Sequence, residues 1–136
     1  HLSDTSCEIF GSDLRVKIPA TGLYTYPDCS IVCGTAEFED QAMDTLLNPT
    51  VLVEILSPST EAYDRGQKFR HYRTIASLQE YILVSQDAVL VEQYTRADGG
   101  VWQLRTYSDR SDHMHLESIG ASLSLAAIYR RIPLEL

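Results

Sequence analysis

Alternating hydrophobic and polar residues predict strands in the first part of the chain. The segment LRVKI, residues 14–18, alternates apolar and basic side chains, which is typical of a half-exposed strand that follows a turn at Gly11. The segment LYTYPDCSIVCG predicts a second strand, with Pro27 near its start and Gly34 at its end. Residues 35–48 are acidic and aperiodic, so we expect a surface loop there.

The segment NPTVLVEILSPST predicts a buried strand followed by a helix. The apolar run from Thr50 to Leu56 has the length of a strand, and Pro58 disfavours helix at the residue before it. Ser59 or Thr60 can cap a helix, which we expect to run over residues 61–75.

The second half of the chain reads as strands with one closing helix. The runs EYILVS, VLVEQYTR and VWQLRTYS are separated by turns at Asp87 and at Asp98 to Gly100, which predicts an antiparallel meander. HMHLES predicts a last strand and LSLAAIYRRI a short C-terminal helix. This order of elements predicts a single mixed α/β (α+β) domain over residues 1–136, with a central mixed sheet flanked by helices.

Glu54 is a lone carboxylate inside an apolar strand, and it needs a partner. A buried ionised carboxylate requires a metal, a cation or several hydrogen-bond donors. Asp28 lies in the preceding strand, also among apolar residues. If these two strands are neighbours, two carboxylates converge, and they either raise each other's pKa or recruit a hard cation such as Mg²⁺.

The predicted helix offers a lysine to this pair. Asp64, Lys68 and Tyr72 follow at four-residue spacing and so share one helix face. An aspartate, a glutamate and a lysine around a divalent ion are typical of phosphodiester hydrolysis, since the metal neutralises the phosphate and activates water.

A structural interpretation of the same residues stays open. In that interpretation Glu54 forms a semi-buried ion pair with Lys68 or Arg65, and Asp28 only caps a turn after Pro27.

Composition limits the class of protein. With 136 residues and 44% hydrophobic content the chain suits one core, and it has neither an apolar run of about 18 residues nor a leader, which predicts a soluble, cytoplasmic protein. Its three cysteines, Cys7, Cys29 and Cys33, include no CxxC pair, so we expect free thiols rather than a disulfide framework. A zinc site that adds His113 and His115 matches no standard spacing.

Charge argues against one kind of nucleic-acid binder. A net charge of -8 does not suit a protein that coats nucleic acid non-specifically through a basic surface. It does not exclude an enzyme that binds a phosphodiester through metal ions. Basic residues gather at Arg65, Lys68, Arg70 and Arg73, a pattern that is also common on solvated helices.

Four segments between Tyr26 and Gln93 form a recognisable series: YPDCSIVCG, PTVLVEILSPST, YDRGQKFRHYR and LQEYILVSQD. They resemble the successive motifs of the Uma-two family, small bacterial proteins proposed to be restriction endonucleases. The resemblance implies a restriction-endonuclease-like fold of the PD-(D/E)xK nuclease superfamily. It also implies a DNA endonuclease that depends on Mg²⁺ or Mn²⁺.

The resemblance also implies roles for individual residues. Asp28 matches the aspartate of the PD motif and Glu54 the acidic residue of the second motif, and these two would bind the metal with the backbone carbonyl of Ile55. Leu56 stands where a standard site has its lysine, and the resemblance implies that the lysine has moved to the following helix as Lys68.

Other positions are given supporting roles or none. Asp64, Tyr72 and Glu80 are expected to support the site, and Ser85, where the family commonly has an aspartate, receives no role. The family usually has an N-terminal helix that contributes a glutamate, and since this chain opens at His1 we expect that helix to be missing or trimmed.

Two functional hypotheses follow. The first is a metal-dependent DNA endonuclease that uses Asp28, Glu54 and Lys68. The second is a catalytically inactive module of the same fold that binds nucleic acid or protein, because a fold alone does not fix function. Enzymes that cut both strands of a duplex commonly present two sites by two-fold symmetry, so we expect a homodimer.

Overall fold

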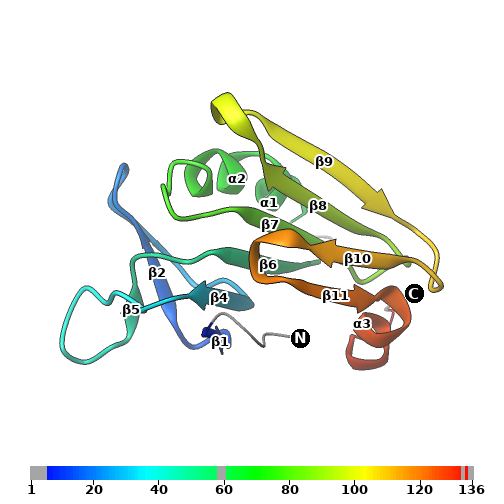
Figure 1. Ribbon diagram of the computed structural model, residues 1–136, viewed down its shortest axis with the longest axis horizontal. Helices are drawn as coiled ribbons and strands as arrows, with labels where there is room; N and C mark the ends of the chain where they lie inside the picture. Colours follow the sequence, from blue (N-terminus) through cyan, green and yellow to red (C-terminus); the bar gives the residue numbers. More distant parts are fainter. Residues whose placement is uncertain (1–5, 58–60, 133, 135–136) are drawn as a thin grey trace.

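A six-stranded mixed sheet forms the centre of the computed structural model, which describes residues 6–57, 61–132 and 134 (Figure 1). The strand order is β1-β4-β6-β7-β8-β9, in which β6 and β7 are parallel and the other neighbours are antiparallel. These strands are β1 Cys7–Phe10, β4 Cys29–Cys33, β6 Val51–Leu56, β7 Glu80–Ser85, β8 Val91–Arg96 and β9 Trp102–Tyr107. The connection between the two parallel strands contains the helices that reach the candidate site.

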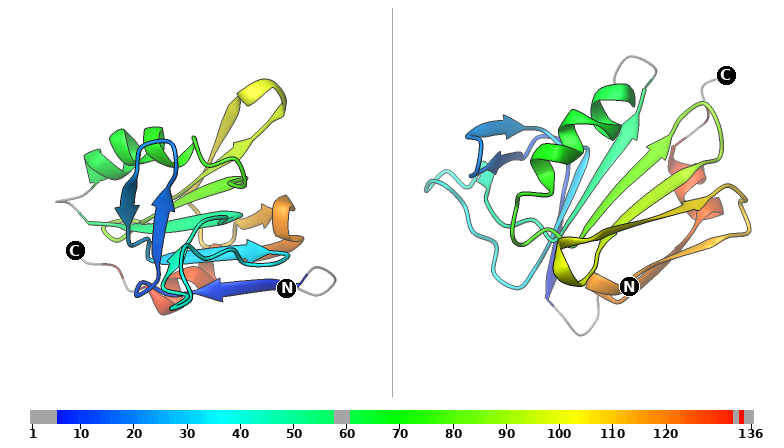
Figure 2. Two further views of the ribbon diagram at one scale, coloured as in Figure 1. Left: turned by 90° about the vertical axis from the view of Figure 1, so that its left-hand side faces the viewer. Right: turned by 90° about the horizontal axis from the view of Figure 1, so that it is seen from above.

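Smaller elements cover both faces of this sheet. Figure 2 shows α1 and α2 on one face and α3 on the other. The helices are α1 Glu61–Arg65, α2 Gln67–Tyr72 and α3 Leu125–Arg131, with single 3-10 turns at Asp98–Gly100 and Glu117–Ile119. One small sheet has the order β3-β2-β5, with β2 Arg15–Ile18, β3 Leu23–Thr25 and β5 Thr45–Leu46. The other pairs β10 His113–Leu116 with β11 Ala121–Ser124.

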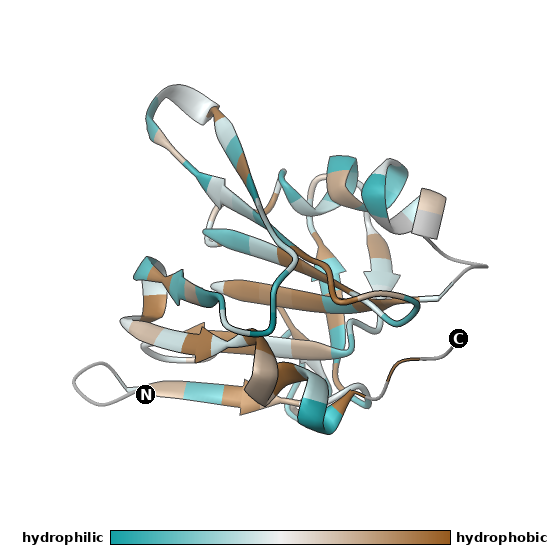
Figure 3. Ribbon diagram, turned by 90° about the vertical axis from the view of Figure 1, so that its right-hand side faces the viewer, coloured by the Kyte–Doolittle hydropathy of each residue, from teal (hydrophilic) through white to brown (hydrophobic). Residues whose placement is uncertain are grey.

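The apolar residues of the sheet form two cores, one on each face. Successive residues of a strand point to opposite faces. In β6, Leu52 and Leu56 therefore join the core under α1 and α2, whereas Val51 and Val53 join the core under α3 and β10. Figure 3 shows hydrophobic residues along the central strands. A mixed sheet flanked by helices, as expected from the sequence, is confirmed.

The predicted meander is confirmed, but the predicted strand over 23–34 is two strands. β7, β8 and β9 are antiparallel neighbours. Pro27 lacks the N–H that a sheet ladder needs, and the chain leaves one sheet at Thr25 and enters another at Cys29.

The helix expected over 61–75 is broken at Gly66. The first helix ends at Arg65, and the second ends at Tyr72, after which backbone hydrogen bonds form turns as far as Ile75. A Cβ at Gly66 would lie 3.2 Å from the carbonyl oxygen of Ala62, so the bend brings the two backbones close. The expected caps at Ser59 and Thr60 lie outside the described residues.

Two short strands lie where none was expected. The segment 35–48 contains β5, whose Thr45 and Leu46 are fully buried, because Leu46 fills the core against β2. The segment LSLAAIYRRI contributes its first two residues to β11, which returns along β10 after a turn at Gly120 with φ 64°. The Ser124 hydroxyl accepts from the Ala127 N–H at 3.0 Å and so caps α3.

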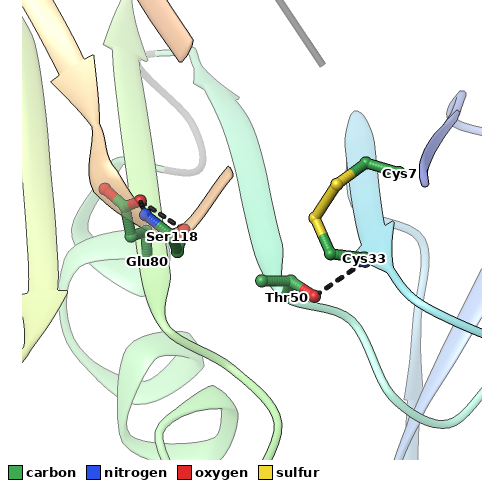
Figure 4. Close-up of a disulfide and its surroundings, with 5 residues drawn as sticks. All are labelled: Cys7, Cys33, Thr50, Glu80 and Ser118. Carbon is green, nitrogen blue, oxygen red and sulfur yellow. Dashed lines mark hydrogen bonds between the residues drawn. A yellow bond between two sulfur atoms is a disulfide. The ribbon is translucent and has the colours of Figure 1, made fainter. Parts of the chain in front are cut away.

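The expectation of free thiols is wrong for two of the three cysteines. Cys7 and Cys33 lie directly opposite each other on β1 and β4, with Cα atoms 4.0 Å apart, and form a disulfide (Figure 4). The Cys33 N–H also donates to Thr50 Oγ1 at 3.0 Å. Cys29 keeps a free thiol. Within the described part of the chain no helix is long and apolar enough to cross a membrane.

Candidate functional site

Glu54 lies on the helix-covered face of β6 and has the cation that its burial requires. Its residue surface is 2% exposed, and it shares its face with Leu52 and Leu56. Glu54 Oε2 lies 2.7 Å from Lys68 Nζ and accepts a hydrogen bond from the Tyr72 hydroxyl at 2.9 Å. A charged donor and a hydroxyl thus compensate a carboxylate that apolar surroundings alone would not tolerate.

The spacing of Lys68 and Tyr72 explains why both reach one carboxylate. They are four residues apart on α2, so their side chains leave the same face of the helix. The Lys68 side chain is only 14% exposed, and its Nζ lies 5.9 Å from the ring centroids of Tyr63 and Tyr72. The ammonium is therefore held against the sheet, where it can act on a group at the end of β6.

Asp28 lies opposite Glu54, one residue before the neighbouring strand β4. Cys29 pairs with Val53, and the antiparallel register continued by one residue sets Asp28 opposite Glu54. Asp28 Oδ2 accepts a hydrogen bond from the Ile55 N–H at 2.7 Å. The carboxylate therefore takes the place of a backbone acceptor just where β4 begins.

A buried hydroxyl pair links this cluster to the small sheet. The Tyr72 hydroxyl, which contacts Glu54, also lies 2.9 Å from Thr25 Oγ1. Tyr72 is fully buried and Thr25 is 8% exposed. This contact holds the end of α2 and the end of β3 against the same carboxylate, and Thr25 is a residue that the sequence did not mark.

The site cluster is thus Asp28, Glu54, Ile55, Lys68 and Tyr72, which the fold brings together from the residue before β4, from β6 and from α2. Three oxygen donors, namely two carboxylates and a backbone carbonyl, converge with one ammonium. Because the N–H and C=O of a strand residue point to the same side, the Ile55 carbonyl faces the side of Asp28. Hard oxygen donors of this kind suit Mg²⁺ or Mn²⁺.

The sequence matches a family model over residues 1–127, and that family, Uma2, is described as "Putative restriction endonuclease". The chain belongs to the Uma2 family.

Relatives with similar sequences occur in a cyanobacterium. The protein slr1290 of Synechocystis sp. is 44% identical over 130 residues, which cover 96% of this Uma2 chain and 67% of the relative. The protein sll1609 of the same organism is 38% identical over 104 residues, covering 76% of this chain and 59% of that relative. The chain therefore spans about two thirds of the length of the curated relatives it matches.

A solved structure shows the same fold. The crystal structure of a "putative nuclease belonging to DUF820" from Anabaena variabilis superposes with a TM-score of 0.73 at 17% sequence identity, covering 93% of this Uma2 chain and 69% of that chain. The restriction-endonuclease-like α+β fold expected from the sequence is thereby confirmed.

Of the residues with expected supporting roles, Tyr72 joins the site cluster and Glu80 does not. The Asp64 side chain lies outside the described part of the structure. Glu80 lies opposite Val51 at the other end of β7, and its strand neighbours Ile82 and Val84 pack in the core under α3. Strand alternation therefore points Glu80 away from the face that carries Glu54.

Glu80 instead belongs to a separate buried network. It is 1% exposed, and its Oε1 accepts from Gln93 Nε2 at 2.6 Å. Its Oε2 accepts from the Ser118 N–H at 3.2 Å and from the Ser118 hydroxyl (Figure 4). Glu80 thus fastens β7 to β8 and to the turn after β10, and the structure gives it no contact with Glu54.

A second buried carboxylate shares the helix-covered face. Glu92 on β8 is 9% exposed and forms an ion pair with Arg65 of α1. Leu83 separates it from Glu54 across the sheet. The open question of which cation pairs with Glu54 is resolved, because Lys68 takes Glu54 and Arg65 takes Glu92. Glu92 is a lone glutamate within the apolar run VLVEQ, just as Glu54 is within VLVEIL, and this pattern could have identified Glu92 from the sequence.

Neither the free thiol nor the apolar cavity beside it belongs to this chemistry. Burial, and secondarily the nearby Asp28 charge, raises the pKa of the Cys29 thiol, which keeps it protonated and poorly nucleophilic. Cys29 lines an apolar cavity of about 420 Å³ under α3, on the face opposite the site cluster. Among the described residues no group of three or more histidines, cysteines, aspartates or glutamates could hold a metal ion, which leaves the zinc alternative without support.

Proposed function

We propose that this Uma2 protein hydrolyses phosphodiester bonds in DNA, with Mg²⁺ or Mn²⁺ as cofactor. The observation that carries the proposal is the convergence of Asp28, Glu54 and Lys68 at the end of β6. Lys68 contacts Glu54 directly, and Asp28 accepts a hydrogen bond from Ile55, the next residue of the same strand. Membership of a family described as restriction endonucleases supports the choice of reaction.

The donor set fits a hard divalent cation. Mg²⁺ is usually held by one or two carboxylates together with water and substrate phosphate rather than by a full protein cage. Asp28, Glu54 and the Ile55 carbonyl would supply that partial set, so a larger cluster of acidic residues is not required. Bound there, the ion would neutralise the phosphate and lower the pKa of a water molecule.

Lys68 and Tyr72 would position the reacting groups. The Lys68 ammonium is held 2.7 Å from Glu54 Oε2, so it lies where negative charge would develop on a phosphate bound at the end of β6. Tyr72 donates to the same Glu54 oxygen and fixes its orientation through a second contact with Thr25. Both donors are in place before substrate binds, which lowers the cost of reorganisation.

Cleavage of supercoiled plasmid DNA tests the proposal. We expect wild-type protein to nick or linearise the plasmid with Mg²⁺ or Mn²⁺ and to stop when EDTA is added. Asp28→Ala should be inactive, and Asp28→Asn, which keeps an acceptor for the Ile55 N–H but loses the charge, should be inactive as well. Full activity in Asp28→Asn would remove Asp28 from the proposed metal ligands. No cleavage of any DNA by the wild type would favour the inactive-module hypothesis.

Metal binding should also stabilise the folded protein. A ligand that binds only the native state at about 100 times its Kd adds ~2.7 kcal/mol of unfolding free energy, so Mg²⁺ or Mn²⁺ should raise the Tm of the wild type by several degrees. Glu54→Gln should abolish the rise, whereas Glu92→Gln, which neutralises the other buried carboxylate of this face, should keep it. Equal metal-induced shifts in all three proteins, measured by differential scanning fluorimetry, would exclude Glu54 as a ligand.

A homodimer would place two of the proposed sites in one assembly. β9 is an edge strand of the six-stranded sheet, and Leu104 at its centre is 48% exposed. We expect light scattering to give a dimer mass at micromolar concentrations and Leu104→Lys to shift it toward a monomer. A monomer mass for the wild type across that range would contradict the prediction.

A further inference from the structure

We infer that the proposed site accepts single-stranded DNA, and that Tyr26 and Tyr63 are the surfaces on which bases beside the scissile phosphate stack. The inference rests on the proposed nuclease function and names its substrate class. Three observations carry it: the position of Tyr26, the position of Tyr63 and the state of the nearby cations.

Tyr26 is exposed although residues on both sides of it are tied to the site. It is 58% exposed. Thr25, the residue before it, contacts the Tyr72 hydroxyl, and Asp28, two residues after it, binds the Ile55 N–H. The backbone at Tyr26 therefore lies at the edge of the site cluster, while its ring remains open to a ligand.

Tyr63 is an exposed aromatic residue of α1 whose ring lies beside Lys68. It is 41% exposed, and its ring centroid lies 5.9 Å from Lys68 Nζ. The other aromatic residues of the helical segment are packed, since Phe69 stacks on Tyr81 at 5.4 Å and Tyr72 is fully buried. The two exposed rings thus belong to different parts of the chain: Tyr26 lies two residues before Asp28, and the Tyr63 ring lies 5.9 Å from Lys68 Nζ.

Cations near the site offer little affinity for a duplex. Among the four basic residues between positions 65 and 73, Arg65 pairs with Glu92 and Lys68 pairs with Glu54. Arg70 and Arg73 are exposed, in a chain of net charge -8. Phosphate contacts supply most of the affinity for duplex DNA, whereas single strands also gain affinity by stacking on aromatic rings. Because two of these four cations are already paired and the chain is acidic overall, the open tyrosines favour a strand with unpaired bases.

Fluorescence anisotropy with the full chain tests the inference independently of turnover. The probes are a labelled oligonucleotide, its duplex, and an abasic strand with the same number of phosphates, all in Ca²⁺ in place of Mg²⁺. We expect wild-type protein to bind the single strand more tightly than the duplex. Tyr26→Ala and Tyr63→Ala should each weaken single-strand binding about 5- to 150-fold. Tyr26→Phe and Tyr63→Phe should keep it, because a phenyl ring still stacks.

Tyr24→Ala is the matched control. Tyr24 is as exposed as Tyr63 at 41%, but its hydroxyl is engaged by Glu39 at 2.8 Å, so its loss should leave binding unchanged. Because an abasic strand has no bases to stack on the two rings, the alanine variants should bind it as tightly as the wild type does. Equal affinity of the wild type for single strand and duplex, unchanged binding by both alanine variants, or equal losses on abasic and normal strands would each overturn the inference. Tyrosine-dependent binding without cleavage would leave it standing and contradict only the proposed nuclease function.

Discussion

Replacing Lys68 with methionine is expected to slow metal-dependent DNA cleavage by about 100- to 1,000-fold, the usual effect of removing one preorganised donor from a transition state. Methionine is unbranched and fills much of the same volume, so it removes the ammonium and leaves the packing of the stem largely in place. Because Lys68 Nζ lies 2.7 Å from Glu54 Oε2, the change acts directly at the site cluster. Initial rates on plasmid DNA at saturating Mg²⁺ measure it.

The same substitution also has a cost in stability, which a metal should offset. Breaking a buried ion pair costs about 3 to 5 kcal/mol when the remaining charge has no other partner. Here the Tyr72 hydroxyl still donates to Glu54, so we expect a loss toward the lower end of that range. A cation bound by Glu54 would restore part of it, and the Mg²⁺-induced rise in Tm should therefore be at least as large in Lys68→Met as in the wild type.

Arg70→Met is the matched control for this prediction. Arg70 lies on the same helix but is exposed, and its replacement should change neither the cleavage rate nor the Tm appreciably. If Lys68→Met lost stability without a selective loss of activity in the folded fraction, Lys68 would be only the structural partner of Glu54. If Lys68→Met cleaved DNA at the wild-type rate, a residue other than Lys68 would have to supply the ammonium.

Placing a lysine at position 56, in place of Lys68, tests the role of the ammonium less directly than the sequence suggested. Leu56 shares a strand face with Glu54, as expected, but it is 2% exposed and belongs to the core under α1 and α2. Lysine there would remove a core side chain at a cost of about 2 to 5 kcal/mol and bury a charge. If Leu56→Lys failed to restore cleavage, the result would therefore not distinguish a folding defect from a catalytic one.

The arrangement around Glu54 was accessible from the sequence because strong physical rules apply to it. A carboxylate in an apolar strand needs a compensating group, and four-residue spacing fixes which helical side chains share a face. Those two rules direct Lys68 and Tyr72 to one point, and both now lie within 2.9 Å of Glu54 Oε2. What the rules did not decide is whether that ion pair is structural or catalytic, since both roles use the same contact.

Features that depend on pairing between distant segments were not accessible in this way. The disulfide forms because the register of β1 with β4 sets Cys7 opposite Cys33, and no local pattern encodes that register. β5 has only two residues and is held by its contact with β2 rather than by its own periodicity. Gly66 is a weak helix former, but an isolated glycine does not decide whether a helix continues, and the close approach to the Ala62 carbonyl is seen only in the folded chain.

The face on which a buried glutamate lies is a further matter of register. Glu54, Glu80 and Glu92 all stand in strand-like apolar runs, and the sequence alone suggested a site role for the first two. In the sheet, Glu54 and Glu92 face α1 and α2, whereas Glu80 faces the opposite core. A shift of one residue in one strand would exchange these faces, so only the three-dimensional pairing separates a site carboxylate from a structural one.

Glu80→Ala should therefore destabilise the fold without altering the chemistry. The substitution removes the acceptor of the Ser118 N–H and one of the two acceptors of the Gln93 amide, which keeps the His115 carbonyl, and it opens a cavity in the core. Unsatisfied buried donors cost about 1 to 3 kcal/mol each, so we expect a total loss of roughly 3 to 5 kcal/mol. For a domain of this size that corresponds to a fall in Tm on the order of 10 to 20 °C, measured by calorimetry.

Two comparisons separate this structural role from a catalytic one. Glu80→Gln keeps the volume and one acceptor oxygen, so its Tm should fall less than that of Glu80→Ala. At a temperature where both variants are folded, each should cleave plasmid DNA at the wild-type rate per folded molecule, because Glu80 lies on the face opposite Glu54. A Glu80→Ala protein that kept its Tm but lost cleavage would return Glu80 to the site and would mean that coupling passes through the sheet from one face to the other.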